Sequence, residues 1–293
     1  MKHLAIVTSL LLFVSCQNSY KILQLTDLHL QLFHPDQVEE VFARMDSLVR
    51  WEDPDLITVT GDLVYSTPSD TLMRIITDRL DSYARPWVII YGNHDHEHGC
   101  TRQQLAQIIV SCKHTLNTLG PDGSLADMEI PAGNWRLFFL DSHAYSTDPV
   151  DYSNFSYAWF TDEQVRWVRE TAGKHPDKPS IAFFHIPFPE HAEVTDYVGN
   201  WTEAVCCGKY NPGMFDAMRE TGFVAAFCGH DHDNDFIAPY QGLALAYGRY
   251  SGSDGEYNHL PKGARVIVLH RGSKHFDTWI REGSGEIKYR ISL

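Results

Sequence analysis

The stretch Trp87-Val88-Ile89-Ile90-Tyr91-Gly92-Asn93-His94-Asp95 decides how this sequence folds. It begins with a short apolar run between Pro86 and Gly92, which predicts a buried strand over 87–91 that ends abruptly. Gly92 allows a sharp turn, so the amide, imidazole and carboxylate that follow can converge on one point. Taken alone, this cluster is equally typical of an ordinary polar turn.

Four further predicted strands end in the same kinds of side chain. The apolar runs 22–26, 56–60, 180–184 and 223–228 lead into Asp27-Leu28-His29, Gly61-Asp62, His185 and Gly229-His230-Asp231-His232. In an open α/β sheet, ligands bind outside the carboxyl ends of the strands, so all five ends should face one crevice. A single histidine after a strand is usually a turn residue, but five strand ends that share Asp, Asn and His indicate a common functional site.

Together these five blocks resemble the signature of the calcineurin-like binuclear metallophosphoesterase superfamily, in particular its purple-acid-phosphatase-like branch. The blocks occur in the family's order across residues 27–232, and Leu140-Asp141-Ser142 and His185-Ile186-Pro187 add to the resemblance. The resemblance implies an α/β fold, a four-layer sandwich of two mixed β-sheets flanked by helices. The alternation of strands and helices, among them a helix expected near Thr101–Leu119, and the strand-rich end of the chain agree with that architecture. We expect one calcineurin-like metallophosphoesterase domain over residues 19–293.

The resemblance also implies a centre of two metal ions. It assigns the first metal to Asp27, His29, Asp62 and His232, and the second to Asp62, Asn93, His185 and His230, with Asp62 as the bridging carboxylate. Imidazole and oxygen ligands suit Fe, Zn or Mn and disfavour calcium. Asp231 and Asp233 lie outside the pattern, so we expect them to be surface carboxylates.

The expected enzyme is a binuclear metal-dependent phosphatase. It would hydrolyse phosphate monoesters by attack of a metal-bridging hydroxide on phosphorus. The alternative is a phosphodiesterase on nucleotide or phospholipid head-group esters, because the same metal core supports both reactions. A non-catalytic surface binding protein is a third reading, which would be marked by the loss of ligands, and every expected ligand is present.

His94 and Asp95 are the predicted catalytic residues. By the resemblance, His94 binds no metal and donates a proton to the leaving oxygen or stabilises the transition-state charge. Asp95 is expected to fix the tautomer and orientation of His94. The alternative role of Asp95 is to cap the following turn.

The mouth of the site should be shaped by the insertion 186–212. His143 and His191 are candidate substrate contacts there, and the alternative for His191 is a solvent-exposed loop histidine. An apolar wall is expected from the aromatic residues Trp159, Phe188, Tyr197 and Trp201, although aromatic-rich loops also pack on themselves.

Tyr65 is a further candidate ligand that we expect not to bind metal. The stretch 61–65 also fits the block of true purple acid phosphatases, in which a tyrosinate binds ferric iron and gives the colour. In those enzymes the first block is Asp-x-Gly, whereas here His29 occupies the place that the phenolate would need. We therefore expect Tyr65 to pack beside the loop and the enzyme to lack a strong purple band.

The first residues predict export. Met1-Lys2-His3 and the apolar run Leu4–Val14 are typical of a signal peptide, since a bilayer span needs about 20 apolar residues. The stretch 13–16 resembles a bacterial lipoprotein processing site, so residues 1–16 would form the signal and Cys16 would carry the lipid. We expect a periplasmic or outer-membrane lipoprotein of a bacterium with lipid-anchored membrane association, and plain secretion is the alternative.

The charge of the chain excludes one class of partner. The net charge is −14 at pH 7, and loss of residues 1–15, which contain one lysine and no acid, makes it −15. Binding to a nucleic-acid backbone is therefore not expected, because its affinity comes from cationic side chains. The expected partner is a small phosphate-ester substrate, whose negative charge the metal ions would offset.

The six cysteines allow a limited set of disulfides in an exported chain. Candidate bridges are Cys100–Cys112 and one from the Cys206-Cys207 pair to Cys228.

Overall fold

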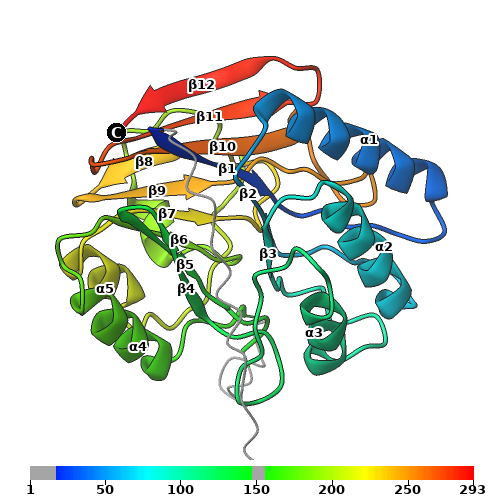
Figure 1. Cartoon of the computed structure of the whole chain (residues 1–293), viewed down its shortest axis with the longest axis horizontal. Coiled ribbons are helices and arrows are strands. Elements are labelled where there is room, and N and C mark those ends of the chain that lie inside the picture. Colours follow the sequence, from blue (N-terminus) through cyan, green and yellow to red (C-terminus); the bar gives the residue numbers. More distant parts are fainter. Residues whose placement is uncertain (1–17, 147–155) are drawn as a thin grey trace, which may run out of the picture.

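A computed structural model of the chain describes residues 18–146 and 156–293. Two six-stranded β-sheets pack face to face at its centre, and helices cover the outer face of each (Figure 1). The predicted four-layer sandwich is confirmed. The predicted signal at residues 1–16 lies outside the described residues. Within the described part of the chain, none of the helices has the length and apolar character needed to cross a membrane.

The first sheet carries the amino-terminal half of the site. Its order is β12-β11-β10-β1-β2-β3, in which β1, β2 and β3 are parallel and the other strands are antiparallel to their neighbours. The strands are β1 (Ser19–Leu25), β2 (Leu56–Thr60), β3 (Trp87–Ile90), β10 (Gly263–His270), β11 (Phe276–Glu282) and β12 (Ile287–Ser292). Its outer face is covered by α1 (Pro35–Glu52), α2 (Ser69–Ser82) and α3 (Arg102–Val110).

The second sheet carries the other half. Its order is β4-β5-β6-β7-β9-β8, with β5, β6, β7 and β9 parallel and antiparallel strands at both edges. The strands are β4 (Met128–Ala132), β5 (Trp135–Phe139), β6 (Ser180–Phe183), β7 (Phe223–Cys228), β8 (Ile237–Tyr240) and β9 (Leu243–Tyr247). Helices α4 (Asp162–Gly173) and α5 (Met214–Glu220) cover its outer face, and a 3-10 turn lies at Pro189–Glu193.

Side-chain alternation along the strands divides the core into three layers. In β1, Ile22 enters the layer between the sheets, whereas Leu23 enters the layer under the first three helices. In β2, Leu56 and Ile57 divide in the same way. Successive side chains of a strand point to opposite faces, so a strand buried on both faces needs a continuous apolar run. This requirement explains why the central strands can be read from the sequence.

Two edge strands and one helix end differ from the expectation. Strands β4 and β8 contain Pro131 and Pro239, which are tolerated at a sheet edge but mask a strand pattern. The helix expected near 101–119 ends at Val110. Beyond it the chain runs beside β3, where the Leu116 N–H donates to the Trp87 carbonyl at 2.9 Å. Pairing with the exposed edge of β3 therefore replaces the last predicted helical turns.

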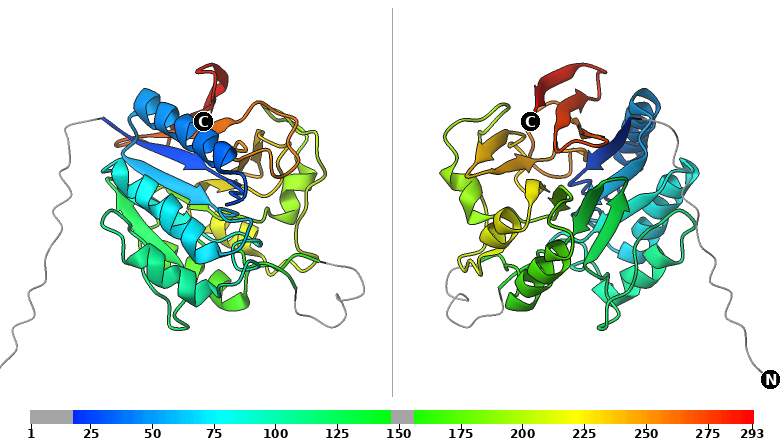
Figure 2. Two further views of the ribbon diagram at one scale, coloured as in Figure 1. Left: turned by 90° about the vertical axis from the view of Figure 1, so that its right-hand side faces the viewer. Right: turned by 60° about the vertical axis from the view of Figure 1, so that its left-hand side comes forward.

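The carboxyl ends of the parallel strands from both sheets meet at one side of the sandwich. Gln24 of β1 joins the sheets there, because its side-chain amide donates to Thr60 Oγ1 and to the Cys228 carbonyl, each at 3.0 Å. In the left view of Figure 2 the first three helices lie in front of the first sheet, and the arrows of β1 and β2 point toward the side where the loops gather.

Candidate metal centre

The seven predicted ligands meet at this edge. Asp27 and His29 follow β1, Asp62 follows β2, Asn93 follows β3, His185 follows β6, and His230 and His232 follow β7. Each is at most 7% exposed. Two carboxylates and four imidazoles buried in one place are costly to desolvate unless they are paired or bind cations.

The side chains form two adjoining groups. Asp27, His29 and His232 form one, Asp62, His185 and His230 form the other, and the ligand atoms within each lie within 4.8 Å of one another. Asp62 Oδ2 lies 3.1 Å from His185 Nε2 and 3.8 Å from His29 Nε2, so this carboxylate stands between the groups. Asn93 Oδ1 lies 3.1 Å from His185 Nε2 and belongs to the second group.

The backbone of the site is unusual. Asp27, His29, Asp62 and His230 have φ angles of 54°, 44°, 53° and 80°. These values lie in the left-handed region, which residues other than glycine seldom adopt. Such conformations persist where the surrounding structure imposes them, and they gather at functional sites.

Two glycines allow the loops to approach one another closely. A Cβ atom on Gly92 would lie 2.1 Å from Asp62 Oδ1, and one on Gly229 would lie 2.0 Å from Thr26 Oγ1. Neither position can hold a side chain without displacement of the loops that carry Asp62 and Asp27. The close approach lets the His94 N–H donate to Asp62 Oδ1 at 2.8 Å.

Backbone carbonyls orient two of the histidines. His185 Nδ1 lies 2.8 Å from the Thr60 carbonyl, and His232 Nδ1 lies 2.8 Å from the Tyr257 carbonyl. In each ring Nε2 then faces a carboxylate, at 3.1 Å from Asp62 and 3.8 Å from Asp27. This is the usual arrangement of metal-binding histidines, in which one ring nitrogen is held and the other binds.

Several buried ring nitrogens fit a metal pair. Both nitrogens of His29 and Nε2 of His230 are buried without a hydrogen-bond partner. A buried polar atom without a partner costs about 1–3 kcal/mol, and a cation bound to one nitrogen of His29 would remove that cost for this atom. Burial lowers the pKa of both histidines well below the usual value, which leaves the neutral imidazole that binds metals. The donor set therefore fits two divalent or trivalent ions.

His94 lies beside the two groups, but its orienting partner differs from the expectation. His94 Nδ1 lies 2.6 Å from Glu97 Oε2. Asp95 instead accepts the N–H groups of Gly92 and of residues 62–64 at 2.7–3.2 Å. The prediction that Asp95 orients His94 is wrong, because both its oxygens hold the neighbouring loops. Glu97 was missed, since nothing in the sequence separates it from the surface acids around it.

The two candidate substrate contacts lie elsewhere. His143 Nε2 lies 3.0 Å from Gln164 Oε1, on the loop after β5. His191 is completely buried between Phe188 and Tyr247, and burial lowers its pKa to about 3. The prediction that His191 contacts substrate is wrong, and so is its solvent-exposed alternative, because the 3-10 turn directs this side chain into the core.

Asp231 and Asp233 are buried as well, contrary to the expectation of surface carboxylates. They are 3% and 6% exposed. Asp231 accepts a hydrogen bond from the Tyr247 hydroxyl at 2.7 Å, and burial raises its pKa to about 8. Asp233 accepts the His259 N–H at 2.6 Å. Both residues lie inside the loop cluster because each directly follows a proposed ligand histidine in the chain.

A cavity of about 80 Å³ opens beside these two groups of candidate metal ligands. It is lined by His29, Asp62, His94, Tyr157, Cys206, His230, Asp231, His232, Glu256 and Tyr257. Tyr65 lies beside it, with its ring edge-on to His29 at 5.0 Å and its hydroxyl bonded to Glu256. The hydrogen bond to Glu256 and burial raise the pKa of Tyr65.

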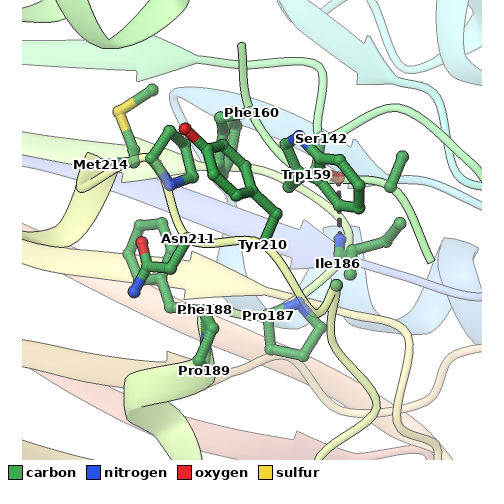
Figure 3. Close-up of a pocket in the computed structure, with 13 residues that line it drawn as sticks. Ser142, Trp159, Phe160, Ile186, Pro187, Phe188, Pro189, Tyr210, Asn211 and Met214 are labelled. Atoms are coloured by element: carbon green, nitrogen blue, oxygen red, sulfur yellow. Dashed lines mark hydrogen bonds between the residues drawn. The ribbon is translucent and has the colours of Figure 1, made fainter. Parts of the chain in front are cut away.

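A separate, mostly apolar pocket lies over the second sheet (Figure 3). Trp159 and Phe188 line it, together with Tyr210, and the Ile186 N–H donates to Ser142 Oγ at 2.8 Å on its wall. The expected aromatic wall is thus divided, because Tyr197 and Trp201 pack against Phe236 instead.

The described cysteines are all free. They are Cys100, Cys112, Cys206, Cys207 and Cys228. The predicted bridges are therefore absent, and Cys228 is buried with its sulfur 3.5 Å from His191 Nε2.

A two-sheet sandwich with carboxylate, amide and imidazole donors at its strand ends defines a metallophosphoesterase scaffold. The sequence model of the family described as calcineurin-like phosphoesterase matches residues 20–234, and the chain belongs to this family. A relative from Arabidopsis thaliana, named probable inactive purple acid phosphatase 29, is 31% identical over 315 residues, which cover 90% of this chain and 80% of the relative.

Solved structures agree on the fold. A dimetal phosphatase from Danio rerio superposes with a TM-score of 0.67 at 12% identity, covering 94% of this chain and 98% of that one. A purple acid phosphatase from yellow lupin (Lupinus luteus) superposes with a TM-score of 0.59 at 12% identity, covering 94% and 53%. At these identities the likeness concerns the fold alone.

Proposed function

We propose that the chain is a binuclear metal-dependent phosphatase that hydrolyses phosphate monoesters. The supporting observation is the convergence of seven buried donors from five strand ends around Asp62, with ring nitrogens of His29 and His230 left without partners. The proposed ligands are Asp27, His29, Asp62 and His232 for one ion, and Asp62, Asn93, His185 and His230 for the other.

The protein's own contribution is to hold the donors and to shape a small cavity beside them. When bound, a metal pair polarises the phosphoryl oxygens and lowers the pKa of water. Asp62 would be the ligand common to both ions: its Oδ2 lies between His185 Nε2 and His29 Nε2, and its Oδ1 accepts the His94 N–H. Because the loops are locked by backbone hydrogen bonds, the donors need little rearrangement during the reaction.

His94 is proposed to serve the leaving group. Its ring lies 5.6 Å from the ring of His29 and lines the cavity. Glu97 holds Nδ1, which leaves Nε2 to donate a proton to the oxygen that departs. Glu97 is thus a positioning residue, whereas Asp95 acts on the loops.

The test is to reconstitute the purified protein with Zn, Mn or Fe and assay it with p-nitrophenyl phosphate and its bis ester. We expect two ions per chain by elemental analysis and faster hydrolysis of the monoester. Asp62→Asn should lose both metal and activity, whereas His94→Asn should keep the metal and lose about 10²-fold in kcat. Loaded protein that hydrolyses neither ester would instead support a binding function, and preference for the bis ester would support the phosphodiesterase alternative.

A further inference from the structure

We infer that the alcohol part of the substrate is a small organic cation, such as a quaternary or primary ammonium group. This inference rests on the proposed function and names the substrate class. It starts from the cavity beside the metal groups, where the part of the substrate next to the phosphoryl group must lie.

The first observation is the charge of the cavity wall. Among the described residues that line the cavity there is neither lysine nor arginine, although such side chains commonly clamp phosphate groups. The carboxylate of Glu256 lines it instead. The Glu203 carboxylate lies behind this wall, where one of its oxygens is within 4.8 Å of Cys206 Sγ and of an oxygen of Asp231, two residues that line the cavity. An anionic leaving group would be repelled by this wall, and a cationic one would be attracted.

The second observation is the presence of aromatic rings at the same place. Tyr257 stacks on His232 with ring centroids 4.5 Å apart, and Tyr157 meets the His230 ring edge-to-face at 4.3 Å. Both tyrosines therefore adjoin proposed metal ligands. An ammonium group within about 6 Å of an aromatic face gains about 0.5–2 kcal/mol, and aromatic cages are the usual site for quaternary ammonium ligands.

The third observation is that rings and carboxylates are held together in pairs. The Tyr257 hydroxyl donates to Glu203, and the Tyr65 hydroxyl donates to Glu256. Glu203 also accepts the Asp233 N–H at 3.0 Å, and both glutamates are half-buried. Glu256 in the wall and Glu203 behind it are held in place by these hydrogen bonds, unlike the freely solvated acids elsewhere on the chain. The two tyrosine–carboxylate pairs, of which Tyr257 and Glu256 line the cavity, form a preorganised site for an organic cation.

A matched pair of esters tests the inference on the metal-loaded full chain. Phosphocholine and 3,3-dimethylbutyl phosphate have the same shape and differ only in the positive nitrogen. We expect kcat/KM to be about tenfold higher for phosphocholine, the factor that one cation–aromatic contact provides. Glu256→Gln and Glu203→Gln should each lower this ratio toward one. Glu170→Gln, an exposed glutamate on α4, should leave it unchanged.

Binding separates this inference from the proposed function. Calorimetric titration of both esters into the loaded protein should give tighter binding of phosphocholine. If neither ester is hydrolysed but phosphocholine still binds more tightly, the phosphatase proposal fails and the cation site stands. Equal binding and equal kcat/KM for the two esters would overturn the cation site and leave the phosphatase intact.

Vesicles of phosphatidylcholine distinguish a lipid head group from a soluble ester. Faster release of phosphocholine from vesicles than of phosphate from phosphocholine would keep the cation site and replace the monoester by a lipid diester. Faster hydrolysis of phosphocholine itself would support both the cation site and a phosphate monoester as the substrate.

Discussion

At the scale of one residue, Gly92 allows two loops of the site to lie close together. Its missing side chain lets the loop after β3 touch the carboxylate of Asp62, the residue that stands between the two metal groups. Without that contact, the His94 N–H could not donate its hydrogen bond to Asp62 Oδ1.

We therefore predict that Gly92→Ala lowers activity by about 10²-fold, the usual effect of displacing a reacting group by an ångström. The new Cβ would lie 2.1 Å from Asp62 Oδ1, so the two loops must separate. Metal content by elemental analysis and kcat/KM are the measurements. Gly173→Ala is the control, since no atom lies within 4 Å of its added Cβ; equal effects of the two changes would contradict the explanation.

His191 should make the fold sensitive to acid. Its pKa of about 3 in the folded chain lies below the usual value of about 6.5, so the unfolded chain binds the proton first. The stability that neutral His191 provides is complete above pH 6.5 and is lost as the pH falls toward 3, by up to about 1.4 kcal/mol per pH unit.

In His191→Asn this contribution is absent. The difference in the free energy of unfolding between the two proteins should shrink by about 1–2 kcal/mol between pH 7 and pH 5. Denaturant unfolding over this range measures it. Metal ligands titrate in both proteins and cancel in the comparison, so a constant difference would show that His191 does not couple to pH.

The visible absorption spectrum of the iron-loaded protein tests whether Tyr65 binds metal. Its hydroxyl is bonded to Glu256, and its ring packs against His29. We predict that iron-loaded protein lacks an intense visible band and that Tyr65→Phe leaves the spectrum unchanged. A strong band that disappears in the variant would establish a phenolate ligand.

At the scale of elements, the loops after β2 and β3 are held together by one buried side chain. Asp95 accepts four backbone N–H groups from these loops and is fully buried. Because a charged acceptor bonded to several donors is stronger than a neutral one, this contact fixes the separation of Asp62 and Asn93.

Asp95→Asn should destabilise the protein by about 2–3 kcal/mol, since its amide group would face backbone donors that it cannot satisfy. The melting temperature should fall, and metal affinity should fall with it. Asp122→Asn is a suitable control, because Asp122 also accepts a backbone N–H, from Ser124 at 3.0 Å, but is exposed. Similar losses in both variants would argue against a special role for Asp95.

The elements that the sequence predicted are those buried on both faces. Strand β2 over Leu56–Thr60 is an uninterrupted apolar and β-branched run, and its bounds match the expectation. The edge strands β4 and β8 escaped prediction because each contains a proline and pairs on one side only. The end of α3 escaped it because a contact with β3, distant in sequence, outweighs helix propensity there.

At the scale of the whole molecule, metal should contribute to stability. Two buried carboxylates, four imidazoles and unpartnered ring nitrogens are gathered where water cannot solvate them. A ligand that binds only the folded state adds about 2.7 kcal/mol at 100 times its Kd.

Chelation should therefore lower the melting temperature by several degrees, and metal should restore it. Differential scanning calorimetry of apo and reloaded protein is the measurement. His29→Asn, which removes one proposed ligand, should respond less to added metal than the native chain does. An apo protein that melts at the same temperature as the loaded one would contradict the proposed centre.

The central strands, the order of the polar blocks at their ends and hence the family can be read from the sequence alone, because these features are local and periodic. The group that each polar side chain contacts becomes known only from the folded chain. Asp95 accepts backbone N–H groups of the loops, Glu97 instead of Asp95 contacts the His94 ring, and His191 is buried in the core. These outcomes depend on packing between segments far apart in the chain, where burial and hydrogen bonding outweigh any preference written in neighbouring residues.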